Sequence, residues 1–484
     1  MSIGSLFSFV FIFGLQHTPA QAQSSQPQPP AISPAAVNPA AENIGDEIRF
    51  KVDKFKLDNG LTVLLYEDHT IPQINYQTWF KVGSKNEEVG YTGMAHLFEH
   101  MMFKGAKRYS GDQFDSLLQS NGGINNAATT TDYTMYYESL PAGKLELLVD
   151  LESDRMENLQ ITEENLKTEK QVVKEERRYR VDGNPIGVLM ELLYEAAYKV
   201  HPYRWPVIGY MEDIDRITLE KANDFHRVYY SPGNATITIA GDFVPDAAKA
   251  LIAKYYGPIP AQTIPDKPRP QEPPQMGGRS GIVDREVQNA QFAIAYHTPK
   301  AGDDDSYALD LLANIMGYGP SSRLYQRLVY RDQIAVDVQT ANYSMQDSGL
   351  FQIFVTLKAG VLPRKIQTAV LGEMWRPRNL KILDVEVQKA KNQIMKSYVD
   401  GLKSLHGKAE SLEINETYFN DYTRLFSDLD HYNKITAEDI HRVAVKYLSP
   451  EKCTIVILRP KKGFRIPAKP KAWAAKSKSH GAKQ

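Results

Sequence analysis

The sequence lacks features that mark several classes of protein. Its 484 residues include a single cysteine, Cys453, which excludes an intrachain disulfide framework and a cysteine-based zinc site. The apolar run at residues 6–15 is too short to span a bilayer. Lys and Arg (57) nearly balance Asp and Glu (58), so the formal charge of −1 gives no electrostatic basis for binding nucleic acid. Because the chain has only one cysteine, any metal site must use histidines and carboxylates.

What is present indicates a soluble protein of more than one domain. Hydrophobic residues make up 42% of the chain and charged residues 24%, which is typical of a globular protein. A proline-rich stretch at residues 257–280 has little apolar content and divides the chain into two parts of similar length. We interpret it as a linker between domains at residues 45–256 and 281–458.

The same sequence pattern recurs at the end of each half. An Ile-Thr-x-Glu start, a helix, a tyrosine, a Ser-Pro pair and a Thr-Ile-x-Ile strand occupy residues 217–239 and recur at residues 435–457. The offset, 435 − 217 = 218, is constant across the match, which predicts an internal duplication. Cys453 falls on the last strand of the second copy, where we expect a small buried residue.

Each half mixes strand and helix patterns. Asn59-Gly60 predicts a hairpin turn, and residues 74–82 alternate as a strand. Helical patterns follow at residues 93–103, 112–120, 144–156, 162–178 and 187–198. We therefore expect an α+β fold of two homologous domains, each an antiparallel-rich sheet packed with helices.

The two ends of the chain differ from its body. Residues 6–15 followed by Ala20-Gln21-Ala22 predict a signal peptide over residues 1–22, although no Lys or Arg precedes the apolar run. An apolar tail is the alternative interpretation. Residues 23–44 are rich in Gln, Pro and Ala and are typical of a flexible tether, and residues 459–484 form a basic tail for which we expect no fixed structure.

The most informative pentapeptide is His96-Leu97-Phe98-Glu99-His100. Positions i and i+4 lie on one face of a helix, so both imidazoles can reach one tetrahedral ion. Glu99 is rotated away from that line and can reach a metal-bound water without occupying a ligand position. This order is the inverse of the commoner His-Glu-x-x-His motif.

A third ligand has to come from elsewhere in the chain. Residues 163–178 offer Glu169 and Glu176, which are seven positions apart and share one helix face, whereas Glu175 points away. We choose Glu176 as the third ligand and Glu169 as the acceptor that orients a ligand imidazole. A solvated helix with two surface histidines is the alternative, which the apolar neighbours of the motif disfavour: Met94, Leu97, Phe98, Met101, Met102 and Phe103.

These residues resemble the pitrilysin/insulinase family of inverted-motif zinc peptidases, in particular its two-domain processing-peptidase branch. The likeness extends from residue 55 to about residue 458 and is carried by LxNG at residues 57–60, VGSxxE at 82–87, GMAHLFEHMMFKG at 93–105, NAxT at 126–129, HPY at 201–203 and YSPxN at 230–234. In that family the distal ligand lies 76 positions after the second histidine, and here 176 − 100 = 76, which supports Glu176.

The resemblance implies hydrolysis of extended or unfolded peptides by one zinc ion per chain. Zinc would act as Lewis acid, its water as nucleophile, and Glu99 as the base that passes a proton to the leaving amine. The segment Asn125, Asn126, Ala127, Ala128 and Thr129 is similar to the family's edge strand, which pairs with the substrate backbone. An ordinary polar strand is the alternative. The resemblance and the signal peptide together predict a bacterial periplasmic protein.

One departure from the family concerns the second half. Relatives carry there an Arg and a Tyr, seven residues apart, that bind the substrate carbonyl and the oxyanion; here those positions hold Val329 and Val336. Arg323 and Tyr330 have the right separation but lie six residues out of register. We therefore predict that this chain is the zinc subunit of a heterodimer whose homologous partner supplies the pair, with a homodimer as a further possibility.

Two further interpretations remain open. The 218-residue offset places Asn314 and Tyr318 opposite the two histidines, so the second half lacks the metal motif. Residues 317–320, GYGP, are either a turn between helices or a glycine-rich substrate loop. The alternative function for the whole chain is a noncatalytic scaffold in which zinc is structural.

Overall fold

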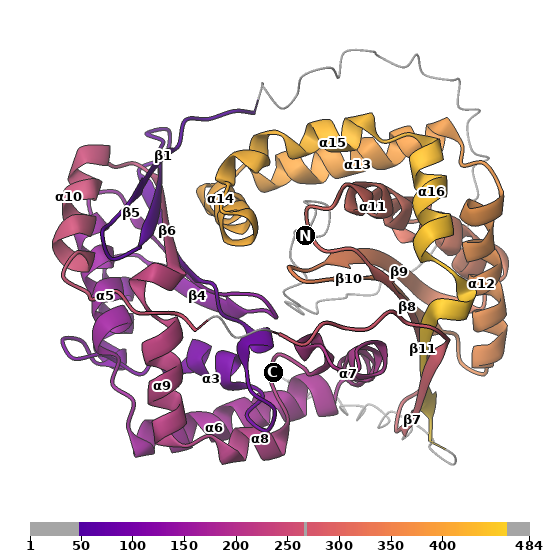
Figure 1. Cartoon of the computed structure of the whole chain (residues 1–484), viewed down its shortest axis with the longest axis horizontal. Helices are drawn as coiled ribbons and strands as arrows, with labels where there is room; N and C mark the ends of the chain where they lie inside the picture. Colours follow the sequence, from indigo (N-terminus) through magenta and orange to yellow (C-terminus); the bar gives the residue numbers. More distant parts are fainter. Residues whose placement is uncertain (1–47, 266–268, 462–484) are drawn as a thin grey trace, which may run out of the picture.

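The computed structural model describes residues 48–265 and 269–461. The predicted signal peptide, the whole tether and most of the basic tail lie outside these residues. Within them, no helix combines the length and apolarity that crossing a membrane requires. Figure 1 shows two halves of similar build side by side, the first in indigo to magenta and the second in orange to yellow.

The first half contains a six-stranded sheet, and most helices of this half lie on the outer face of that sheet (Figure 1). Its elements are β1 (Asp53–Lys56), β2 (Thr62–Glu67), β3 (Gln73–Phe80), α3 (Met94–Met101), α4 (Gly111–Ser120), β4 (Ile124–Thr129), β5 (Thr134–Pro141), α5 (Leu145–Asn158), α6 (Glu163–Arg177), the π-helical turn η2 (Arg178–Asp182), α7 (Pro185–Ala197), α8 (Met211–Arg216), α9 (Leu219–Tyr229), β6 (Ala235–Gly241) and α10 (Pro245–Tyr256).

The second half contains a five-stranded sheet. Its elements are β7 (Arg279–Arg285), β8 (Gln291–Thr298), α11 (Asp304–Gly317), the π-helical segment η5 (Tyr325–Arg331), β9 (Ala335–Ser344), β10 (Gly349–Leu357), α12 (Pro363–Asn379), α13 (Asp384–Gly401), α14 (Leu405–Phe419), α15 (Asp428–Lys434), α16 (Ala437–Tyr447) and β11 (Cys453–Pro460). Cys453 is buried, as expected. Described residues between α10 and β7 include no helix or strand.

The sheets confirm the predicted α+β fold and have matching topologies. The strand orders are β1-β2-β6-β3-β5-β4 and β7-β11-β8-β10-β9. Most neighbours are antiparallel, and the two parallel pairs, β2 with β6 and β11 with β7, occupy corresponding places. The 218-residue offset holds for whole elements, because α9 (219–229) and β6 (starting at 235) correspond to α16 (437–447) and β11 (starting at 453). Asn59-Gly60 lies in the turn of the β1–β2 hairpin, as predicted.

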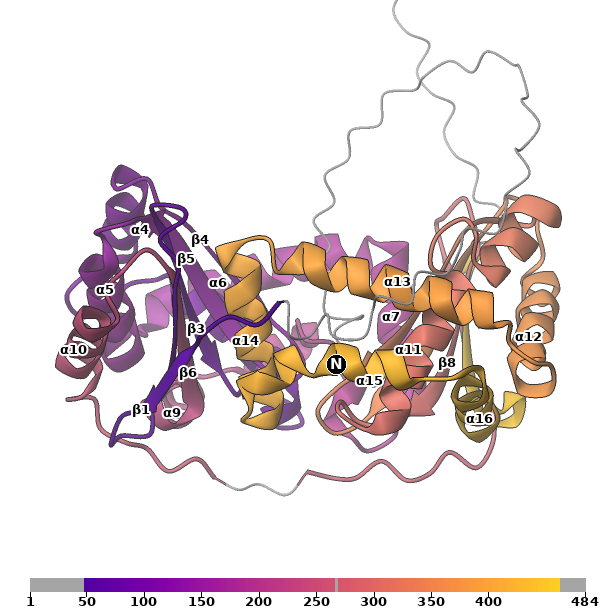
Figure 2. The same ribbon diagram turned by 90° about the horizontal axis from the view of Figure 1, so that it is seen from above.

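The halves are joined by an exchange of helices. Helix α14, from the second half, packs on β6 and β3 of the first sheet, and α7, from the first half, packs on β7, β8 and β11 of the second. Figure 2 shows α14 beside the first sheet and α7 on the side of the second. Each contact has its own apolar cluster, for example Leu64 with Leu412 and Leu193 with Val456. Each sheet therefore needs a helix of the other half to cover one face.

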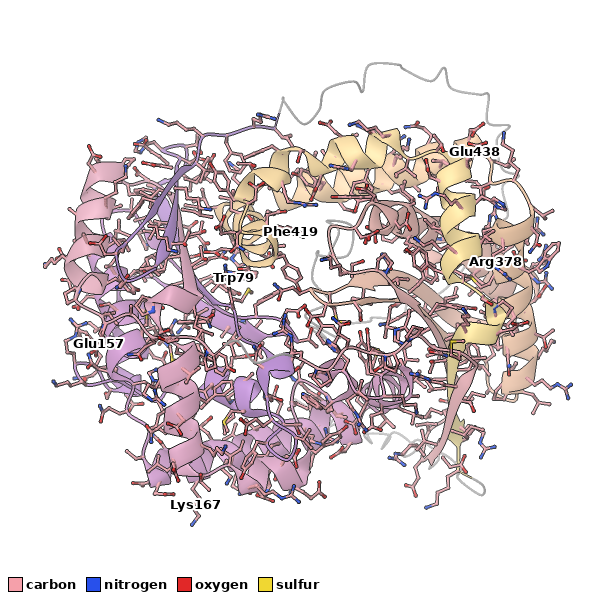
Figure 3. All side chains as sticks on the ribbon, viewed as in Figure 1. Trp79, Glu157, Lys167, Arg378, Phe419 and Glu438 are labelled. Atoms are coloured by element: carbon pink, nitrogen blue, oxygen red, sulfur yellow. The ribbon has the colours of Figure 1, made fainter. Side chains whose placement is uncertain are left out.

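A third cluster lies where the two halves meet at the middle of the molecule. Trp79 of β3 stacks on Tyr133 at a ring distance of 4.3 Å, and Tyr418 and Phe419 of α14 pack against the same group. Figure 3 labels Trp79 and Phe419 at this junction. The adjoining Asp132, in the β4–β5 turn, accepts hydrogen bonds from Tyr203, Tyr418 and the backbone of Gln346, so it ties both halves together.

Candidate metal centre

Helix α3 begins in a way that fixes its position against the sheet. Gly93 has φ +89°, and a Cβ there would lie 2.6 Å from the carbonyl oxygen of Ile208, so only glycine fits. No side chain of the cap residue closes the helix. Instead the buried carboxylate of Glu87 accepts the backbone N–H groups of Gly93 and Ala95, at 3.0 and 2.8 Å. An acid at this end also interacts favourably with the helix dipole.

Helix α6 supplies the carboxylates that face α3. Its first turn is closed by a capping box, in which the Thr162 hydroxyl accepts the Asn165 N–H and the Asn165 amide oxygen accepts the Thr162 N–H. The helix packs against α3. The side chains of Glu169 and Glu176 point to α3, whereas Glu175 is 71% exposed and pairs with Arg178.

The structure brings His96, His100 and Glu176 together. Glu176 Oε2 lies 3.7 Å from His96 Nε2 and 3.2 Å from His100 Nε2, and one ligand atom from each residue lies within 4.8 Å of the others. Ligands at about 2.0–2.1 Å from a tetrahedral zinc ion are about 3.4 Å apart. The three side chains therefore have the spacing of a metal site; it is the one such cluster found in the described part of the chain.

The two imidazoles of the centre differ in charge state. Burial lowers the pKa of His96 to about 4, so its imidazole is neutral at pH 7. Burial acts in the same direction on His100, but its hydrogen bonds with Glu169 and Glu176 outweigh it and raise the pKa to about 9. A metal ion has to displace that proton from His100. Two imidazoles and one carboxylate form the donor set of a catalytic zinc site with an open fourth position.

A second contact orients His100. Its Nδ1 lies 3.3 Å from Glu169 Oε2, which leaves Nε2 directed at Glu176. The other carboxylate oxygen of Glu169 is 2.5 Å from Lys104 Nζ. Glu169 is buried, with its side chain 3% exposed, so this pairing keeps a charged carboxylate stable beside the site. Its position is that of the predicted orienting acceptor.

Glu99 lies on α3 directly before His100 and is half-buried. Burial raises its pKa, and Thr129 at the end of β4 and the charge of His100 oppose this shift. A carboxyl group whose pKa is raised above its usual value accepts a proton more readily than an unperturbed one. Glu99 is not one of the three residues whose ligand atoms converge.

The predicted substrate strand is β4, which lies at one edge of the first sheet. It pairs with β5 on one side only, and it lies next to α3. Asn126 is exposed, and Asn125, Ala127, Ala128 and Thr129 are half-buried. The backbone of β4 is thus open for pairing along its outer edge; that it binds substrate stays a prediction.

The second half has valines where the resemblance predicts substrate-binding residues. Val329 is half-buried in η5, and Val336 is 50% exposed at the start of β9. Arg323 is held by Glu386 through two hydrogen bonds of 2.8 and 2.7 Å. Residues 317–320 join the end of α11 to the segment before η5, with Gly319 at φ +76°. Gly317 is the last residue of α11, and residues 318–320 form a bend and turn; that this segment binds substrate stays a prediction.

Sequence reasoning missed one contact of the centre. Arg180, in the π-helical turn η2, places Nη1 2.9 Å from Glu176 Oε1. Its spacing of four residues from Glu176 is the sequence signal that could have identified it. The quoted motifs contained Glu87 and Lys104, but their contacts with the start of α3 and with Glu169 depend on tertiary structure.

Each half of the chain matches a family of known proteins. The family described as "Insulinase (Peptidase family M16)" matches residues 62–210, and "Peptidase M16 inactive domain" matches residues 216–394. Zinc protease PqqE of Helicobacter pylori is 31% identical over 420 residues, which cover 85% of this chain and 93% of the relative. YmxG of Bacillus subtilis, named an uncharacterized zinc protease, is 24% identical, with 84% and 98% covered.

Solved structures agree with the sequence relatives. The crystal structure of a protease from Helicobacter pylori matches with a TM-score of 0.81 and 30% identity, covering 85% of this chain and 99% of that one. A structure titled peptidase M16 inactive domain, from Pseudomonas fluorescens, matches with a TM-score of 0.78 at 20% identity, with 85% and 98% covered, a likeness of fold. The chain belongs to peptidase family M16, the insulinase family.

Proposed function

We propose that this protein is a zinc-dependent endopeptidase that hydrolyses extended or unfolded peptides. The observation that carries the proposal is the convergence of His96, His100 and Glu176 on one position, with Glu99 on the same helix but outside the donor set. The zinc protease names of the relatives support zinc as the metal.

The residues of the site suggest a division of roles. Zinc bound there would supply a Lewis acid for the scissile carbonyl and for the attacking water. Glu99 would take the proton of that water on its carboxylate and give it to the amine that leaves, and its raised pKa suits both steps. Glu169 would hold His100 in the tautomer that presents Nε2.

The open edge of β4 supports extended peptides as substrates. A peptide that pairs with β4 as an added strand would be held by main-chain hydrogen bonds, for which an extended peptide has free groups along its whole length whereas a folded protein has already used most of its own. Because β4 lies next to α3, such a strand would pass beside the metal centre. Binding through the backbone predicts tolerance of many side chains.

Val329 and Val336 support the need for a second chain. Valine can neither donate a hydrogen bond to an oxyanion nor orient a carbonyl, and the loss of one such donor commonly reduces the rate by about 10² to 10³. We therefore propose a heterodimer in which a homologous chain without the metal motif supplies an Arg/Tyr pair, with a homodimer as the alternative. We further propose export to the bacterial periplasm, on the signal-peptide pattern of residues 1–22.

Replacing Glu99 by Gln tests the enzymatic role. The variant should bind zinc like the wild type, because Glu99 is not a donor, while cleavage of an unfolded peptide falls by at least about 10²-fold. Glu175→Gln is the matched control, since Glu175 is exposed on α6 and pairs with Arg178. Equal cleavage by wild type and Glu99→Gln would reject the proposed mechanism. Zinc binding without any cleavage, alone or with a partner, would favour the scaffold function.

The partner requirement has a separate test. Cleavage is measured with the chain alone and after addition of a co-encoded homologue that has an Arg and a Tyr seven residues apart but no His-x-x-Glu-His motif. We expect a large gain in rate on mixing, of about 10² or more. Equal rates would reject the split site and leave the zinc centre itself unaffected.

A further inference from the structure

The two carboxylates of α6 are held in the same way. In Glu169, one oxygen lies 3.3 Å from His100 Nδ1 and the other 2.5 Å from Lys104 Nζ. In Glu176, Oε2 lies 3.2 Å from His100 Nε2, and Oε1 lies 2.9 Å from Arg180 Nη1. Each carboxylate thus faces an imidazole with one oxygen and a cation with the other.

We propose that Arg180 is a positioning residue that keeps Glu176 a one-oxygen ligand of the metal centre. This inference rests on the proposed zinc function. A glutamate side chain has three rotatable bonds, and its carboxylate can turn both oxygens toward a cation. With Oε1 held by Arg180, only Oε2 is presented beside His96 and His100. One coordination position then stays open for water or substrate.

The place of Arg180 in the chain fits this role. It follows α6 in the π-helical turn η2, a type of turn that is frequent at functional sites. Its side chain is 68% exposed, whereas that of Glu176 is 17% exposed, so the guanidinium approaches the carboxylate from the solvent side. The forked geometry of a guanidinium suits it to fixing a carboxylate.

A cation beside a metal site also opposes metal binding through charge repulsion. This makes the proposal easy to overturn, because the two effects change zinc affinity in opposite directions. If fixing Glu176 is the larger effect, removal of the guanidinium weakens zinc binding. If repulsion is larger, the same change strengthens it.

The test uses the purified full chain with Zn²⁺ alone as the probe. Arg180→Met keeps the length of the side chain without its charge, and Arg180→Lys keeps the charge without the fork. Arg178→Met is the matched control, because Arg178 lies in the same turn and pairs with the exposed Glu175. The zinc dissociation constant is measured by competition with a chromogenic chelator.

We expect Arg180→Met to raise the zinc dissociation constant by at least about 10-fold, as for other groups that orient metal ligands. Arg180→Lys should restore part of the affinity, and Arg178→Met should stay within about twofold of the wild type. The visible spectrum of the Co²⁺-loaded protein should change in Arg180→Met and not in Arg178→Met, because only the former frees Glu176 to bind through both oxygens.

The outcomes separate this inference from the proposed function. Zinc binding by Arg180→Met that equals or exceeds that of the wild type would overturn the inference, as would an equal loss in Arg178→Met. Normal zinc binding by the wild type with no peptide cleavage would count against the proposed function alone. A wild-type chain that binds no zinc would overturn both.

Discussion

Helices α6 and α13 occupy the two homologous halves and bury positions at the same spacing. In α6 the buried residues are Leu166, Glu169, Val173 and Arg177, and in α13 they are Val387, Ala390, Ile394 and Tyr398. When the two buried sets are aligned, at an offset of 390 − 169 = 221 for this helix pair, the two charged residues of the first set correspond to Ala390 and Tyr398. Both helices meet the same requirement for packing, but only the half with the candidate metal centre has charged groups at these positions.

The difference teaches where this fold accepts buried charge. A buried ionised group is unfavourable unless it is paired. Glu169 has Lys104 and His100, and Arg177 has Glu191 and the carbonyl of Gly209. The second half has an alanine and a tyrosine at the two positions, so it needs no such charged pairs there.

Placing a glutamate at the position of α13 that corresponds to Glu169 should have the largest effect on stability. Ala390 is 0% exposed, and Ala390→Glu would bury a carboxyl group among apolar residues without a partner. We expect a loss of stability on the order of 5 kcal/mol, or failure to fold. Urea unfolding measures it, with the exposed Gln388→Glu on the same helix as control, expected to change stability by less than about 0.5 kcal/mol. Unchanged stability of Ala390→Glu would break the comparison.

Substitution of Asp132, which holds the two halves together, should have the next largest effect on stability. Asp132 and Lys85 form a buried ion pair at 2.8 Å, with both side chains no more than 2% exposed. Asp132→Asn leaves the Lys85 charge without its partner, and we expect a loss of about 3–5 kcal/mol in the free energy of unfolding. Asp400→Asn, in an exposed pair with Lys396, should change it by less than about 1 kcal/mol. Similar losses in both variants would show that burial at the junction has no special role.

The exchanged helix α14 should make stability depend on pH. Burial raises the pKa of Glu410 to about 7, and His406 and Tyr133 are its titratable neighbours. The folded state keeps a proton that the unfolded state releases above pH 4.5, so the contribution of this group to stability is lost as pH rises from about 4.5 to 7. Glu410→Gln should therefore gain on the order of 3 kcal/mol relative to the wild type between pH 5 and 8. Parallel pH profiles in thermal unfolding would contradict this.

Replacing Glu169 of α6 by alanine, the residue at the corresponding position of α13, should have the smallest free-energy effect of the four changes. It should act on zinc binding. Glu169→Ala removes the acceptor of His100, and we expect zinc affinity to fall by about 10- to 100-fold, or about 1.4–2.8 kcal/mol. Chelator competition measures it. Unaltered affinity would mean that packing alone orients His100.

The sequence alone determined the features that depend on neighbours a few residues apart. Helical geometry places His96 and His100 on one face whatever surrounds them, and the Asn59-Gly60 turn gives the hairpin. The repeat also located corresponding elements, because a duplicated segment folds to the same local structure. Helix geometry selected the face shared by Glu169 and Glu176, and the spacing seen in the family that the chain resembles supported Glu176 over Glu175 as the ligand.

Only the tertiary structure decided how the halves combine and what surrounds the centre. The apolar faces of α7 and α14 would fit either sheet as far as periodicity shows, and their exchange depends on which faces meet in space. The contacts of Glu87 with the start of α3, and of Arg180 with Glu176, likewise depend on how side chains are directed in the folded chain. Short-range patterns specify elements, whereas pairing between distant elements is selected by the packing of the whole molecule.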